Sequence, residues 1–136
     1  MRLLCWHVDY IKWRPTHEVK GISEPASMDW NEVKECIACL IAVEQKDESN
    51  PELINQAIKG INEVVGQVKV NRIVLYPYAH LSNSLSKPLF AKQVISKLKE
   101  LLISNGFEVF NSPFGWDKEF EVHCKGHPLA ETARII

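Results

Sequence analysis

The 136-residue sequence lacks any apolar run long enough to cross a membrane. Its longest candidate, Cys36 to Val43, has only the length of a strand. The segment from Met1 to Trp6 is too short for a signal peptide, and His7 and Asp9 interrupt it early. We therefore expect a cytoplasmic protein.

The sequence also lacks an excess of basic residues, with 16 lysines and arginines against 17 acidic residues and a formal net charge of -1. A domain that held a large nucleic acid alone would normally be basic, because phosphate neutralisation supplies most non-specific affinity. We therefore expect this chain to touch only the end of any nucleic acid, while another domain supplies most of the affinity.

Several catalytic signatures are missing. The chain has no glycine-rich phosphate loop, no Gly-x-Ser-x-Gly turn, no dinucleotide-binding fingerprint and no His-Glu-x-x-His zinc motif. His123 and His127 are four residues apart but flank Gly126, so they lack the helical register of a zinc pair. These absences leave no standard metal or nucleotide site.

Cysteine is scarce and does not form a metal motif. Cys36 and Cys39 form a single C-x-x-C pair inside a strand-like segment, and no second pair accompanies it. Residues three apart on a strand point to opposite faces of the sheet, so these thiols cannot easily share one ion. We expect core cysteines, with Cys5 and Cys124 in the same role.

The residues that are present favour a single α/β domain over residues 1–136, since 46% are hydrophobic and 24% are charged. Two helices are predicted. One begins near Ser49-Asn50-Pro51 and carries an apolar stripe, and the other opens at Ser86-Lys87-Pro88 and ends at Asn105-Gly106. Strands are predicted at residues 2–9, 10–13, 33–43, 71–78, 107–110 and 119–124, with a loop over 15–31 and a partly helical tail.

The order of these elements predicts how the strands pair. Strands that alternate with helices in the middle of the chain favour parallel crossovers. Strands that follow one another at both ends of the chain favour antiparallel pairs. A mixed sheet is therefore expected.

Three polar clusters are candidates for chemistry. His80 follows a predicted strand, at the kind of loop that carries ligand sites in α/β folds, although a loop histidine bonded to backbone explains it equally well. Lys118 follows the turn Pro113 to Trp116 and can polarise a carbonyl or position water, although most turn lysines are simply solvated. Glu131 is expected in the first turn of the tail helix, where an acidic residue usually complements the helix dipole.

These strings together resemble a known family. The segment Tyr-Pro-Tyr-Ala-His-Leu-Ser at residues 76–82, the turn Pro-Phe-Gly-Trp at 113–116 with Lys118, and Cys-Lys-Gly-His-Pro-Leu-Ala-Glu at 124–131 resemble motifs of the N-terminal editing domains of archaeal threonyl-tRNA synthetases. The N-terminal string Met-Arg-Leu-Leu, leading to His-Val-Asp-Tyr at 7–10, resembles the same family. The motifs keep their order along essentially the whole chain.

The resemblance implies a fold and a reaction. The fold is the D-aminoacyl-tRNA deacylase-like α/β sandwich of mixed β-sheets with two main helices, in a homodimer. The reaction is hydrolysis of the ester that joins L-serine to the 3′ end of threonine tRNA, assisted by the substrate's own 2′-hydroxyl. It implies no metal, no cofactor and no covalent nucleophile for editing. The partners are threonine tRNA and the remainder of a threonyl-tRNA synthetase, of which this chain is the N-terminal part.

The resemblance also implies site residues. Lys118 orients the substrate and the attacking water, His80 lines the same pocket, and Glu131 lies near the terminal adenosine. Phe114 and Gly115 shape the adenosine pocket. Further pocket positions are Val43, Glu44, Ala79 and Ala91.

Asp117 departs from the family pattern, because a relative has tyrosine there. Beside Lys118, an aspartate either draws the ammonium away or replaces a water-mediated contact. Two alternatives remain open at this point. One is a free-standing D-aminoacyl-tRNA deacylase, and the other is a non-catalytic module that binds the tRNA end or dimerises.

Overall fold

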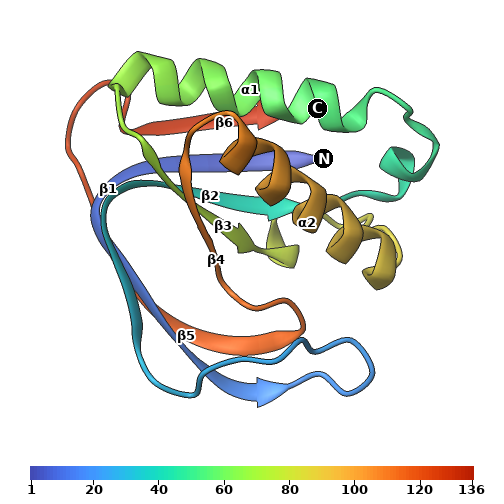
Figure 1. Ribbon diagram of the computed structural model, residues 1–136. Helices are drawn as coiled ribbons and strands as arrows, with labels where there is room; N and C mark the ends of the chain where they lie inside the picture. The colour runs from blue at the N-terminus through green and yellow to red at the C-terminus, as the bar shows by residue number, and fades with distance from the viewer.

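The computed structural model describes residues 1–136 as one mixed sheet with two helices on one of its faces (Figure 1). Two short 3-10 turns, η1 (Gln45–Ser49) and η2 (Ala79–Leu81), complete the regular structure. The α/β fold class predicted from the sequence is confirmed. The strands and helices are β1 (Arg2–Glu18), β2 (Asn31–Ala42), α1 (Leu53–Val68), β3 (Arg72–Pro77), α2 (Pro88–Ser104), β4 (Glu108–Asn111), β5 (Trp116–Cys124) and β6 (Glu131–Ile135).

The strand order is β4-β3-β2-β1-β5, and β6 also pairs with β1. The pairs β2–β3 and β3–β4 are parallel, as the alternation of strands and helices predicted. The pairs β1–β2, β1–β5 and β1–β6 are antiparallel. One expectation is wrong: β4 and β5 follow one another in the chain but do not pair, because β5 crosses to the opposite edge of the sheet.

Strand β1 connects two parts of this sheet. On one edge its first residues, Arg2 to Trp6, pair with β6, and the stretch from Val8 to Glu18 pairs with β5, with two register shifts inside that stretch. Figure 1 shows β1 turning sharply, so that its second half and β5 form a layer facing the rest of the sheet. This doubled-back arrangement gives the sandwich that the family resemblance implied.

The loop predicted over residues 15–31 is shorter in the structure, because β1 continues to Glu18. Pro15 lies opposite Lys118 of β5, and the register shifts immediately after it. A proline has no N–H to donate, so it is tolerated in a strand where pairing is interrupted. The remaining loop, residues 19–30, lies beside the start of β5.

Both helices begin close to the predicted residues, and α2 also ends close to its predicted end. The Asn50 side chain accepts a hydrogen bond from the Glu52 amide at 3.0 Å just before α1, although Glu52 is the residue in the N-cap position. Helix α2 has Pro88 in its first turn and Asn105 at its C-cap, and Gly106 follows with φ of 94°. Neither helix is long and apolar enough to cross a membrane.

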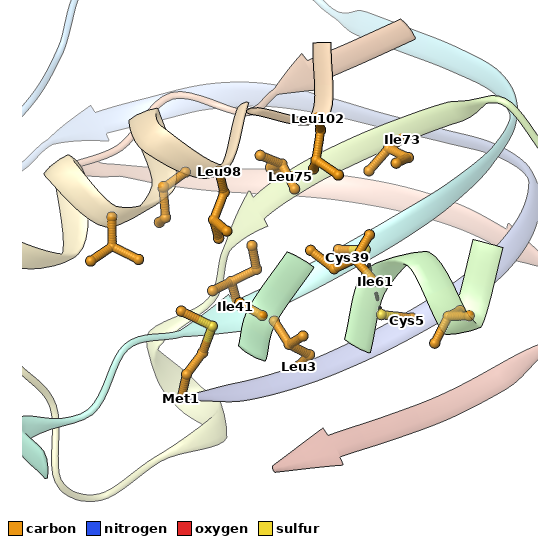
Figure 2. Packing of buried hydrophobic residues seen from close by; sticks show 14 of the residues in the cluster. Met1, Leu3, Cys5, Cys39, Ile41, Ile61, Ile73, Leu75, Leu98 and Leu102 are labelled. Carbon is orange, nitrogen blue, oxygen red and sulfur yellow. Dashed lines mark hydrogen bonds between the residues drawn. The ribbon is translucent and has the colours of Figure 1, made fainter. Parts of the chain in front are cut away.

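Both faces of the sheet carry a packed core. The larger cluster lies between the sheet and the helices and is drawn in Figure 2, where Cys5 and Cys39 approach to 3.4 Å. Each fully buried aliphatic side chain in it stabilises the fold by about 1.5–3 kcal/mol. The second cluster, which includes Val8, Ile11 and Trp13, lies on the other face of the sheet.

The prediction of core cysteines is confirmed for Cys5, Cys36 and Cys39, whereas Cys124 is only partly buried at the edge of the second cluster. Cys39 belongs to the helix-side core, whereas Cys36 belongs to the core on the opposite face. Burial raises the pKa of the Cys36 thiol to about 12, so it stays protonated near neutral pH. No disulfide forms, and no three His, Cys, Asp or Glu side chains converge as metal ligands would.

The helical tail predicted around Glu131 is wrong, because residues 131–135 form strand β6. The first residues of β1 offer an unpaired edge, and the tail pairs with it in antiparallel register from Trp6↔Glu131 to Arg2↔Ile135. Further backbone hydrogen bonds at both ends fix this pairing, from His7 N to Ala130 O at 2.7 Å and from Ile136 N to Met1 O at 2.9 Å. Pairing with such a strand edge stabilises a five-residue segment more than an isolated helical turn would, because a helix this short is costly to nucleate.

Candidate active site

One cavity of about 500 Å³ collects most of the predicted site residues. It opens where the carboxyl ends of β2 and β3 meet the start of α2, the turn before β5 and the loop of residues 19–30. Its lining is mostly apolar, as is usual for a small-molecule site. The predicted residues that line it are Val43, Ala79, His80, Ala91, Phe114, Gly115, Asp117 and Lys118.

Lys118 lies on β5, and its ammonium contacts two backbone carbonyls and an aromatic ring. Its Nζ donates to the carbonyl oxygens of Pro113 at 2.9 Å and Trp116 at 3.3 Å, and lies 5.1 Å from the centre of the Tyr76 ring. Burial lowers the pKa of Lys118 to about 8, although the carboxylates of Glu24 and Asp117 act in the opposite direction. A lysine with this pKa is a candidate functional group on physical grounds.

Asp117 does not capture the ammonium of Lys118. Neighbouring residues on a strand point to opposite sides, and the Asp117 side chain is exposed and makes no ion pair with Lys118. Its carboxylate acts on the lysine only through space, by raising its pKa. The first of the two roles considered for Asp117 is therefore not observed.

His80 lies in η2, immediately after the carboxyl end of β3. Its ring is exposed and packs edge-on against Tyr78, with 5.2 Å between the ring centres. The Tyr78 amide donates to Ile41 O at 2.8 Å, which anchors the strand exit beside β2. His80 and Lys118 are thus both lining residues of one cavity, although they are 38 positions apart in the sequence.

Backbone hydrogen bonds hold the cavity wall at the end of β2 in place. Val43 is only 3% exposed, and its carbonyl oxygen accepts the Ser86 amide at 3.0 Å. An isolated bridge between Glu44 and Leu85 continues this contact. The segment before α2 is therefore held against the end of β2, and Val43, Ala79 and Ala91 form a fixed wall.

Gly115 is required by close packing. Its φ is +80°, and a Cβ at this position would lie 2.6 Å from Ser23 Cα and 2.7 Å from the carbonyl carbon of Ile22. The turn therefore presses directly on the backbone of the loop of residues 19–30. Any side chain here would force the two segments apart.

Glu24 holds this loop against the turn before β5, and the sequence analysis did not identify it. Its carboxylate accepts the Phe114 amide at 2.7 Å, and its backbone oxygen accepts Trp116 Nε1 at 2.7 Å. Val19 and Ile22 of the same loop line the cavity. In the sequence, only the presence of Val19 and Ile22 within a largely polar loop indicated that this loop packs against the site.

Two predicted residues do not line the cavity. Glu44 is 6% exposed and lies in a neighbouring cleft beside His80, with Arg2 Nε donating to its carboxylate at 2.6 Å. Burial acts to raise the pKa of Glu44, but hydrogen bonds from Arg2 and Ser82 and the N-terminal ammonium outweigh it and lower that pKa. Its contacts are therefore those of a residue that holds the N-terminus in place.

Glu131 lies on β6 opposite Trp6, exposed and away from the cavity. Within one chain, the structure does not bring it to Lys118 or His80. The expectation that Glu131 lies in a helix is wrong, because it is the first residue of strand β6.

Comparisons with known proteins agree on one family. The sequence profile of the Archaea-specific editing domain of threonyl-tRNA synthetase matches residues 1–136. Threonine--tRNA ligases from Methanocaldococcus jannaschii, Thermococcus kodakarensis and Methanosarcina mazei are 43%, 42% and 46% identical to the chain. Each alignment covers the whole chain but only 22% of the relative, so the chain spans about a fifth of their length.

A solved structure shows the same fold with little sequence in common. The c-Myc DNA Unwinding Element Binding Protein superposes with a TM-score of 0.73 at 9% identity, covering 100% of this chain and 99% of that one. At this identity the likeness concerns the fold alone.

Proposed function

Because the chain belongs to the family of Archaea-specific editing domains of threonyl-tRNA synthetase, we propose that its cavity hydrolyses the ester joining L-serine to the terminal adenosine of threonine tRNA. The observation that supports this most is the shared cavity of Lys118 and His80. An amine buried enough for its pKa to fall to about 8 is a poised electrostatic group, not a merely solvated one.

A second site of this kind has a physical reason to exist. Serine lacks one methyl group of threonine, and a binding site discriminates one such group by only about 1–3 kcal/mol, or roughly 10–200-fold. Hydrolysis in a second, smaller site multiplies the discrimination. In our proposal Val43, Ala79 and His80 form the wall that admits the serine side chain and excludes the extra methyl of threonine.

The proposed chemistry adds water across the ester. The Lys118 ammonium stabilises the negative charge that develops on the carbonyl oxygen and orients the attacking water. The bond between the carbonyl carbon and the ribose oxygen breaks, and the ribose oxygen takes up a proton as serine leaves. The neighbouring 2′-hydroxyl of the substrate assists, as the family resemblance implied.

The proposed partners follow from size and charge. A chain with net charge -1 that spans 22% of its relatives is proposed to act as the N-terminal domain of a longer synthetase, which supplies most of the contact with tRNA. A homodimer is proposed as well, and sedimentation of the chain at several concentrations tests it.

The test is a deacylation assay with the 136-residue chain. We expect release of serine from seryl-tRNA to be at least about tenfold faster than release of threonine from threonyl-tRNA. Lys118→Met should abolish most of this activity, and Lys59→Met, at an exposed position on α1 outside the cavity, should not change it.

Other outcomes separate the alternatives. Hydrolysis of a D-aminoacyl-tRNA in preference to L-seryl-tRNA would identify a D-amino-acid deacylase. Binding of the tRNA end without any hydrolysis would identify a non-catalytic module. If Lys118→Met hydrolysed seryl-tRNA at the wild-type rate, the lysine would have no role in catalysis.

A further inference from the structure

A second groove of about 560 Å³ adjoins the catalytic cavity, lined mainly by polar residues of α2 and the end of β4. The groove and the cavity share Pro77, Ile95 and Phe114 in their walls, so the two spaces are neighbours. We propose that this groove, called the α2 groove below, binds the phosphodiester backbone of the single-stranded 3′ end that enters the cavity. This inference rests on the proposed function.

Lysines on one side of α2 give the α2 groove its charge. Lys92 and Lys99 are seven residues apart, which places them on the same side of the helix about 10 Å apart along its axis. Ser96 lies between them and also lines the groove. This spacing suits a chain of successive phosphates better than a single small anion.

The positive charges in the α2 groove are largely uncommitted. Lys92 makes no ion pair and no side-chain hydrogen bond, and Lys99 donates only to the neutral Asn111 Oδ1, at 2.6 Å. Of the two acidic residues there, Glu100 pairs with Lys97 at 3.3 Å, whereas Glu24 forms no ion pair and accepts hydrogen bonds only from the amides of Phe114 and Asn111. Two ammonium groups therefore remain available to an anionic ligand.

Two further observations favour a ligand in this groove. Ser112 is one of the lining residues, and its buried hydroxyl has no hydrogen-bond partner, which is uncommon for a buried polar group. Leu89, at the start of α2, is 66% exposed and offers an apolar surface at the same groove. A nucleotide presents both a polar backbone and an apolar base face to such a surface.

Two other clefts are less suited to phosphates. The cleft beside His80 contains Arg2 and Lys46, but both face the carboxylate of Glu44, at 2.6 Å and 3.7 Å. The cleft near Trp13 has no lysine or arginine in its lining. Charge complementarity and continuity with the cavity therefore single out the α2 groove.

The experiment compares two substrates. Seryl-tRNA carries the phosphodiester backbone, whereas the serine ester of adenosine carries none. For Lys92→Gln and Lys99→Gln we expect KM for seryl-tRNA to rise about three- to tenfold per lysine at unchanged kcat, as for loss of one charge-assisted contact. The dependence of log(kcat/KM) on log salt should become shallower by about one unit for each lysine.

The serine ester of adenosine should be hydrolysed equally by wild type and both variants, and Lys59→Gln is the matched control for loss of one positive charge. Equal losses on both substrates would show a structural role for the lysines and overturn the inference, as would unchanged kinetics on seryl-tRNA.

A binding measurement keeps the α2 groove testable if hydrolysis fails. If wild type hydrolyses neither substrate, the proposed function fails, and fluorescence anisotropy with a labelled single-stranded RNA ending in CCA then tests the groove by itself. Weaker binding by Lys92→Gln and Lys99→Gln than by Lys59→Gln supports the inference. Equal affinities for all these variants refute it.

Discussion

The pH dependence of serine release is the sharpest test of Lys118. Its pKa of about 8 means that about nine-tenths of the molecules carry the ammonium at pH 7 and only about one-tenth at pH 9. If the charged form orients substrate and water, the rate of the chemical step falls nearly tenfold across that range. An ordinary lysine, with pKa about 10.4, would stay charged throughout.

A second variant moves the profile in a known direction. Burial is the main cause of the lowered pKa of Lys118, and the Asp117 carboxylate partly opposes it. Asp117→Asn removes this opposing charge from an exposed side chain, so the pKa of Lys118 should fall further. The loss of rate should then begin at lower pH, while the rate at pH 6 stays close to that of wild type.

The assay is single-turnover deacylation of seryl-tRNA from pH 6 to 9.5 at constant ionic strength, corrected for spontaneous ester hydrolysis. Lys118→Arg is an informative control, because a guanidinium stays charged across this range. Any residual activity of Lys118→Arg should lack the fall above pH 8. A wild-type rate that stays flat or rises up to pH 9.5 would refute an active ammonium at Lys118.

Three further variants test separate parts of the site. Lys118→Met should raise the free energy of unfolding at pH 7 by about 1–2 kcal/mol while abolishing activity, because it removes a partly buried charge. In urea titrations, the free energy of unfolding of the wild type should rise between pH 8 and 10.5, where the unfolded chain binds more protons than the folded one. The variant should lack this rise. Gly115→Ala should lower the free energy of unfolding by about 1–3 kcal/mol, since its Cβ meets backbone atoms at 2.6–2.7 Å and its φ is +80°, and an unchanged urea midpoint would contradict this packing. Val43→Ala should increase hydrolysis of threonyl-tRNA relative to seryl-tRNA by roughly tenfold or more, and an unchanged ratio would exclude Val43 from the sieve.

Local patterns in the sequence predicted the parts of the fold that depend on local physics. The apolar stripe of α1, Pro88 in the first turn of α2 and Gly106 after its end each have a cause within a few residues. The opposite facing of Cys36 and Cys39 follows from the period of a strand alone. Such features need no knowledge of distant segments.

Pairing between distant segments accounts for the main errors. Nothing within residues 131–135 distinguishes a strand from a short helix, because the deciding factor is the open edge of β1 at the other end of the chain. The continuation of β1 past Pro15 depends in the same way on β5, which lies about a hundred residues away. For the same reason, the role of Glu24 was invisible until the turn before β5 was placed against it.

Burial differs between Lys118 and the two lysines of the α2 groove, and our proposals assign them different roles. Lys118 sits in a largely apolar cavity, where burial weakens its hold on a proton and strengthens any electrostatic effect on a bound ester. Lys92 and Lys99 lie in a polar groove beside it, only partly buried, where a charge costs little and is screened by salt. In our proposals, a chain with net charge -1 binds a nucleic-acid end through a few lysines, and catalysis and attraction depend on different ammonium groups. It follows that salt should weaken the attraction at the α2 groove far more than the chemical step at Lys118, so rising salt should increase KM for seryl-tRNA while leaving kcat nearly constant.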